Sequence, residues 1–137
     1  MSHQTQTRAG LTAQIKTNFE DALLRTTEAL KSQGFGVLTE IDVRETMKKK
    51  LDIDFPPYKI LGACNPPLAH QALSQAPEVG LLLPCNVTVR QLDDETVEVA
   101  IADPHMLVDF TAQPALEPLA AQARAKLEQV TQQLLVQ

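Results

Sequence analysis

The chain has 137 residues, of which 44% are hydrophobic and 21% are charged, so we expect a single domain over residues 1–137 with its own core and no wholesale disorder. A net charge of -5 repels phosphate backbones, which disfavours nucleic acid as a partner. The polar N-terminus lacks the apolar core of a signal peptide, and no stretch is long enough to cross a bilayer. These features predict a soluble cytoplasmic protein with no membrane partner and with reduced cysteines.

Residues 1–7 are polar, and we expect them to form a flexible N-terminus. The sequence Thr17 to Glu20 then has the pattern of a capping box, in which the threonine and the glutamate satisfy backbone N–H groups at a helix start. Apolar residues recur at helical spacing after it, and Gly34 can adopt the left-handed turn that ends a helix. We therefore predict a helix over residues 18–33.

The next segment, residues 35–41, alternates and contains branched residues, which predicts a strand with one face against that helix. Asp42 and Glu45 repeat the capping pattern and predict a short helix that ends near Leu51. Three consecutive lysines, residues 48–50, lie near its last turn, where positive charge suits the helix dipole. We interpret them as a solvated helix face rather than as a nucleic-acid site.

Pro56 and Pro57 end this helix, and residues 58–64 then predict a strand. Asn65 is a good N-cap and is followed by proline, so residues 66–74 should form a helix. Residues 80–90 predict a strand in which Pro84, having no N–H group, must lie at an edge or a bulge. Residues 96–101 predict the return strand of a hairpin.

Asp103 followed by proline predicts a helical turn over residues 105–110, and Pro118 predicts the start of the last helix. Apolar residues in this helix are spaced by threes and fours. They form a narrow stripe that can pack on a sheet or on a partner helix. The stripe consists of Leu116, Ala120, Ala123, Leu127, Val130 and Leu134.

Three segments resemble the domain of unknown function 302 family: GFGVLTEIDV at 34–43, KILGACNPPLA at 59–69 and GLLLPCNV at 80–87. The resemblance continues into the last helix. It implies an α+β fold in which helices pack on a curved antiparallel sheet, similar to the TATA-binding-protein-like arrangement, with a first strand over residues 8–15. It also implies a homodimer, and it implies no established activity.

Two short segments carry most of the unusual chemistry, Cys64-Asn65-Pro66 and Pro84-Cys85-Asn86. Cys64 lies at a predicted strand-to-helix corner, where the helix dipole favours a thiolate; the alternative is a small buried side chain. Asn65 either caps the helix or contacts a ligand. Asn86 either binds a ligand or ties down the backbone beside the proline.

Cys85 and two histidines extend this candidate site. Cys85 can lie beside Cys64 on a neighbouring strand, where the thiols would bind a soft metal or form a reversible disulfide, or it is a packing residue. The separation of the two cysteines is unlike that of a zinc site, and we assign no metal ligand. His70 and His105 would complete a Cys/His set or carry protons, or they are ordinary surface residues.

Three functions are compatible with these residues. The first is a dimeric module that binds a small ligand or a metal at Cys64, Asn65, Cys85 and Asn86. The second is a thiol-dependent enzyme or redox protein with Cys64 as its nucleophile. The third is a protein-interaction domain with purely structural cysteines. We favour the first, because catalysis needs a base that the sequence does not supply. The cofactor, if any, is unspecified.

Overall fold

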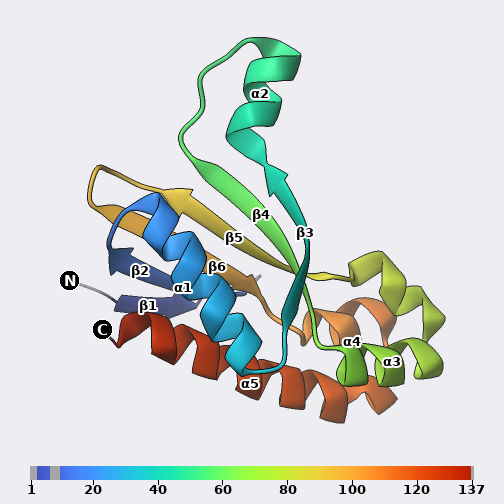
Figure 1. The fold of residues 1–137 in the computed structure, drawn as a ribbon. Helices are drawn as coiled ribbons and strands as arrows, with labels where there is room; N and C mark the ends of the chain where they lie inside the picture. Colours follow the sequence, from blue (N-terminus) through green and yellow to red (C-terminus); the bar gives the residue numbers. More distant parts are fainter. Residues whose placement is uncertain (1–2, 7–9, 137) are drawn as a thin grey trace.

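The computed structural model of the chain describes residues 3–6 and 10–136. The strands of this part form one six-stranded antiparallel sheet in the order β1-β2-β6-β5-β4-β3 (Figure 1). The predicted α+β class, with helices against an antiparallel sheet, is confirmed. In chain order the elements are β1 (His3–Gln6), β2 (Gly10–Lys16), α1 (Phe19–Ser32), β3 (Gly36–Asp42), α2 (Val43–Leu51), β4 (Tyr58–Cys64), α3 (Pro66–Gln75), the 3₁₀ helix η1 (Pro77–Leu82), β5 (Cys85–Gln91), β6 (Thr96–Ala102), α4 (Met106–Thr111), the 3₁₀ helix η2 (Pro114–Leu116) and α5 (Glu117–Leu135).

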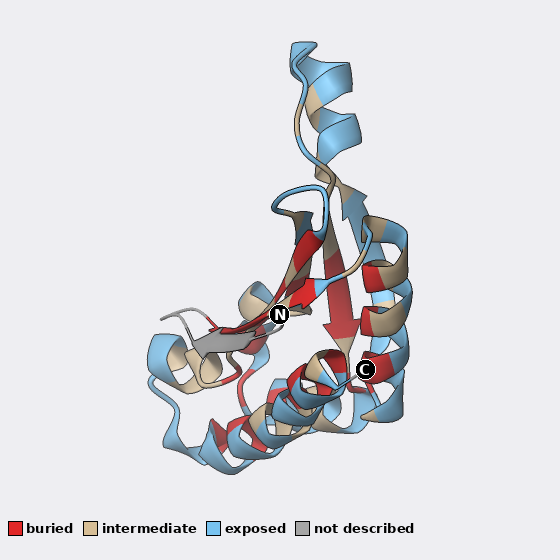
Figure 2. Ribbon diagram, turned by 90° about the vertical axis from the view of Figure 1, so that its left-hand side faces the viewer, coloured by how far each residue is buried: buried red, intermediate tan, exposed pale blue. Residues whose placement is uncertain are grey.

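The main core lies between one face of the sheet and the helices α1 and α5. Alternate residues of β6, Val97, Val99 and Ile101, are buried on this face, beside buried residues of the strands that pair with β6. Leu30 of α1 and Leu127 of α5 cover them. Figure 2 shows this as buried segments along the central strands and along the helix sides that face them. Each such side chain stabilises the fold by about 1.5 to 3 kcal/mol.

The ends of α1 follow the predicted signals, with one shift. Asn18, not Thr17, is the N-cap, and its side chain accepts a hydrogen bond from the Asp21 backbone N–H. The Thr17 hydroxyl instead donates to the Asp21 carboxylate. Threonine and asparagine are both good N-caps, and because Thr17 and Asn18 are adjacent, the sequence pattern led to the wrong one. Gly34 has a φ of 84°, as predicted for the residue that ends the helix.

Strand β3 is confirmed, but only its start lies against the helix as predicted: β3 contacts α1, and Val37 packs against the main core. Leu38 is 67% exposed and Ile41 is 51% exposed. β3 is the last strand of the sheet, and its register shifts between Val37 and Thr39. The helix α2 starts at the predicted cap, Asp42, buries none of its residues and projects away from the sheet (Figures 1 and 2).

The predicted strand over residues 80–90 is correct only in its second half. Residues 80–82 belong to η1, and β5 begins at Cys85. Pro77 opens η1, and the Leu83–Pro84 peptide bond between η1 and β5 is cis. The predicted hairpin of β5 and β6 is confirmed, with Gln91 opposite Val97 nearest the turn.

The segment expected to be a flexible N-terminus, residues 1–7, contains the first described strand, and its flexibility stays a prediction. His3–Gln6 form β1, which pairs antiparallel with β2. Residues 1, 2 and 7 lie outside the described residues, as do Arg8 and Ala9 of the expected first strand. The described part of that strand belongs to β2, which begins at Gly10 and pairs with β6.

The helix α5 carries the predicted apolar stripe except for Leu116, which belongs to η2 and precedes the first residue of α5. Ala123 is partly buried, and the other stripe residues are buried. Its C-terminal half covers the main core, while Leu119 near its start joins a second cluster with α3 and η1. No described helix is both long enough and apolar enough to cross a membrane. The candidate site lies where α5 passes from one cluster to the other.

Candidate functional site

The two Cys-Asn segments lie on neighbouring strands. Cys64 ends β4 and Cys85 starts β5, and the two strands pair antiparallel with Ala63 opposite Cys85 and Gly62 opposite Asn86. The two cysteines, which are 21 positions apart in the sequence, therefore belong to adjacent strands at one edge of the sheet. Both are free thiols, and both are partly buried.

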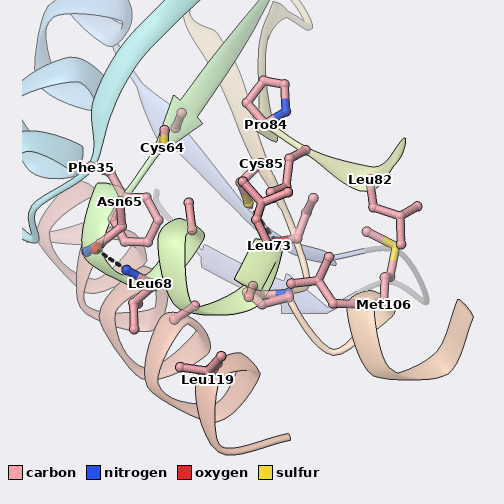
Figure 3. A pocket seen from close by; sticks show the side chains of 18 of the residues that line it. Phe35, Cys64, Asn65, Leu68, Leu73, Leu82, Pro84, Cys85, Met106 and Leu119 are labelled. Atoms are coloured by element: carbon pink, nitrogen blue, oxygen red, sulfur yellow. Dashed lines mark hydrogen bonds between the residues drawn. The ribbon is translucent and has the colours of Figure 1, made fainter. Parts of the chain in front are cut away.

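A cavity of about 300 Å³ lies at this edge of the sheet (Figure 3). Its walls come from the ends of β4 and β6, the start of β5, the helices α3 and α4, and the first half of α5. Almost all of its lining is hydrocarbon, and five alanines leave the space open. The lining residues are Phe35, Leu38, Ala63, Cys64, Asn65, Leu68, Ala69, Ala72, Leu73, Leu82, Leu83, Pro84, Cys85, Ala102, Asp103, Pro104, Met106, Leu107, Leu119 and Ala123.

Asn65 holds the corner between β4 and α3. Its Oδ1 accepts a hydrogen bond from the Leu68 backbone N–H at 3.3 Å, which makes it the predicted N-cap (Figure 3). Its Nδ2 donates to the Gln33 carbonyl oxygen at 3.5 Å. Only 9% of the residue is exposed. Because both ends of the amide are used by the protein, Asn65 positions α3 against the end of α1.

Gly62 permits a close approach of three chain segments. A Cβ atom at this position would overlap Thr39 Oγ1 and come within 2.7 Å of Pro84 Cγ. Real Cβ atoms avoid such distances, so any larger residue here would push Pro84 or Thr39 away. Since Pro84 lines the cavity, the absence of a side chain at Gly62 helps to fix the cavity wall.

The Cys85 thiol is held in its protonated form. Burial, and after it the negative charge of Asp103, raises the pKa of Cys85 to about 12. The Cys85 Sγ donates a hydrogen bond to the Ala102 carbonyl oxygen at 3.6 Å. At neutral pH the thiolate fraction is on the order of one in 10⁵. Cys85 is therefore poorly suited to resolve a disulfide, and it acts as an apolar lining residue.

Asp103 is the one charged side chain among the described lining residues, and a network surrounds it. Its Oδ1 accepts a hydrogen bond from the His105 backbone N–H at 2.9 Å and lies 3.3 Å from His105 Nδ1. Its Oδ2 pairs with Nη1 of Arg124 on α5, and Arg124 Nε donates to Glu128 at 2.9 Å. The Asp103 side chain is 13% exposed. This network anchors the start of α4 to α5.

The structure does not bring the remaining predicted residues to the cavity. Asn86 is exposed and is absent from the lining, although it directly follows Cys85. His70 is exposed on α3 and does not line the cavity, and His105 contacts Asp103 from outside it. The part of the chain that the structure describes contains no group of three or more His, Cys, Asp or Glu residues placed to hold a metal ion, so His70 and His105 complete no Cys/His set there.

Sequence reasoning missed the lining residues on α4 and α5, among them Met106, Leu119 and Ala123. A signal for one of them was present. Ala123 belongs to the predicted stripe of α5, but it is an alanine where four of the other five members are leucine or valine. A small side chain on a buried stripe leaves space unless a neighbour fills it.

Comparison with known proteins assigns the chain to a family. The family model described as "Domain of unknown function DUF302" matches residues 11–134. The chain belongs to the DUF302 family. A solved DUF302 structure, described as the crystal structure of an uncharacterized conserved protein from Bacillus stearothermophilus, is 32% identical and has a TM-score of 0.84. The match covers 93% of this chain and 99% of that one. No curated protein matches the chain.

Proposed function

We propose that this DUF302 domain binds a small, largely apolar molecule in the cavity between the Cys64-Asn65 corner and the Pro84-Cys85 segment. The observation that carries the proposal is a volume of about 300 Å³ whose walls are almost entirely hydrocarbon. Concave apolar sites with a few polar groups are the usual form of small-molecule sites. The residues that contribute are Cys64, Cys85 and the aliphatic side chains of α3, α4 and α5, while Asn65 positions the wall.

The lining favours a ligand over trapped water. A water molecule needs two to four polar partners, and most of the side chains that surround this space supply none. An apolar ligand loses little by entering such a cavity and gains about 0.8 kcal/mol for each methylene group that leaves water. Two of the lining residues, Leu38 and Leu73, have exposed side chains, so a ligand can enter the cavity from solvent beside them.

The same observations weigh against a thiol-dependent enzyme. A dithiol mechanism needs a second thiolate near Cys64, and the raised pKa of Cys85 disfavours it. Asp103, the carboxylate of the cavity, is already engaged by Arg124 and His105. The homodimer and the cytoplasmic location stay predictions from the sequence.

Binding of the uncharged fluorescent dye N-phenyl-1-naphthylamine tests the proposal. The emission of this dye rises in apolar surroundings, so a titration gives an affinity directly. Ala69→Phe fills the cavity from α3, because Ala69 is a partly buried lining residue. Ala121→Phe is the matched control, since Ala121 is exposed on α5 and does not line the cavity.

We expect saturable, one-site binding to the natural chain and to Ala121→Phe, and a loss of at least about tenfold in affinity for Ala69→Phe. Circular dichroism and thermal unfolding check that the variants are folded. Equal binding by both phenylalanine variants would place the dye elsewhere and contradict the proposal, as would the absence of saturable binding to the natural chain.

A further inference from the structure

The position of Asp103 indicates what kind of polar group the ligand carries. Asp103 lines the cavity at the end of β6, next to Ala102, and its carboxylate is the one formal charge in the described lining. Its basic partner, Arg124, does not line the cavity. Asp103 is therefore the charged residue that a polar group meets in the described lining, while Arg124 pairs with its Oδ2 from outside that lining.

The carboxylate retains capacity for another donor. A carboxylate offers about four acceptor positions on its two oxygens. The His105 backbone N–H donates to Oδ1, His105 Nδ1 lies 3.3 Å from the same oxygen, and Arg124 Nη1 pairs with Oδ2. These contacts use at most two positions on Oδ1 and one on Oδ2, so one position on Oδ2 is left. A ligand N–H or O–H group fits this position, whereas a ligand carboxylate supplies no donor for it.

The charges of the network point in the same direction. Arg124 is shared between Asp103 and Glu128, so one guanidinium faces two carboxylates. The negative charge of Asp103 acts inside the cavity, since it contributes to the raised pKa of Cys85. A cation entering beside Asp103 is attracted, and an anion is repelled.

We infer that the cavity selects an apolar molecule bearing a cationic amine, with the amine at the free position of Asp103 Oδ2 and the hydrocarbon part among Leu73, Met106 and Leu119. This inference rests on the proposed function and specifies its ligand class. It excludes free fatty acids and other apolar anions, which fit the hydrocarbon walls equally well but place a negative charge next to Asp103.

Displacement of N-phenyl-1-naphthylamine by three compounds with the same eight-carbon chain tests the inference. These are octylamine, 1-octanol and octanoate, each used below its micelle concentration. We expect octylamine to bind at least about tenfold more tightly than octanoate, with octanol between them. Asp103→Asn keeps the Oδ1 acceptor for the His105 N–H and removes the charge. In this variant the three affinities should lie within about threefold of one another.

A matched variant separates the local charge from the overall charge of the chain. Asp94→Asn removes one negative charge from the exposed turn between β5 and β6, outside the cavity lining, and should retain the order of the natural chain. Octanol binding to Asp103→Asn shows that its cavity is intact. If Asp103→Asn fails to fold, the affinities for the natural chain and for Asp94→Asn test the inference. Tighter binding of octylamine than of octanoate to both chains supports it, and equal binding of the two compounds contradicts it.

The outcomes distinguish the two proposals. Octanoate binding as well as octylamine to the natural chain would overturn the amine inference and leave the proposed function standing. A preference for octylamine that persists in the folded Asp103→Asn variant would overturn it as well, because the preference would then come from the overall charge. If neither the dye nor any of the three compounds binds the natural chain, the proposed function itself fails.

Discussion

Replacing Asn65 by alanine tests whether this residue positions α3 or serves the ligand. The variant removes the N-cap of α3, because alanine has no side-chain oxygen to accept the hydrogen bond from the Leu68 N–H. Such a cap typically stabilises a helix by about 1 kcal/mol. It also removes the bond to the Gln33 carbonyl, whose 3.5 Å length makes it the weaker of the two and adds only a few tenths of a kcal/mol. We expect the free energy of unfolding to fall by about 1 to 1.5 kcal/mol.

Serine at the same position is the matched control. Its hydroxyl caps a helix about as well as asparagine, but it is too short to reach Gln33, so Asn65→Ser should lose only a few tenths of a kcal/mol. The assay is urea unfolding followed by far-UV circular dichroism, because the chain has no tryptophan. For a chain of this length the alanine variant should also melt roughly 3 to 5 °C lower. Unchanged stability of Asn65→Ala, or equal losses for alanine and serine, would refute the capping role.

Two further predictions concern the cavity wall and the buried thiol. Gly62→Ala should lower the free energy of unfolding by roughly 1 to 3 kcal/mol, because its Cβ meets Pro84 and Thr39. Gly36→Ala is the control, since a Cβ there has no atom within 4 Å, and it should change the free energy of unfolding by less than about 0.5 kcal/mol. Both are measured by urea unfolding, and similar losses for the two variants would contradict the prediction. In a Cys64→Ala background, Cys85 should resist iodoacetamide at pH 9 in the folded chain and react once the chain is unfolded in urea. Rapid reaction in the folded chain would refute the claim that folding protects this thiol.

The raised pKa of Cys85 also links stability to pH. Between pH 9, near the ordinary pKa of the thiol, and about 12, the unfolded chain has lost this proton and the folded chain retains it. The folded state then binds more protons, so this contribution is fully present below pH 9 and decreases as the pH rises, by up to about 1.4 kcal/mol per pH unit. Cys85→Ala should remove this part of the alkaline slope, and an identical slope in both chains would contradict the assignment.

Local signals in the sequence were sufficient for several of the helix ends. The Asn65 cap, the left-handed Gly34 and the Asp42 cap of α2 depend on residues within one turn, and the structure has all three. The exposure of β3 could not be predicted in the same way. It depends on which strand ends the sheet, and the strand order follows from long-range pairing.

For the same reason, only part of the candidate site could be predicted from the sequence. The Cys64 and Cys85 segments indicated its place, because proline and asparagine beside cysteine stand out in a plain chain. The opposite wall comes from Leu119 and Ala123 of α5, and the ion pair of Asp103 with Arg124 joins residues 21 positions apart. Such contacts are set by the packing of helices, which the spacing of apolar residues alone does not specify.

The most direct test of ligand binding in the cavity uses the methionine methyl groups as site-resolved reporters. Met106 lines the cavity, whereas Met47 lies on α2, which projects away from the sheet. In a chain labelled with ¹³C at the methionine methyl groups, titration with uncharged 1-octanol should shift the Met106 resonance in a saturable manner and leave that of Met47 in place. An unchanged Met106 resonance, or equal shifts at Met106 and Met47, would contradict binding in this cavity.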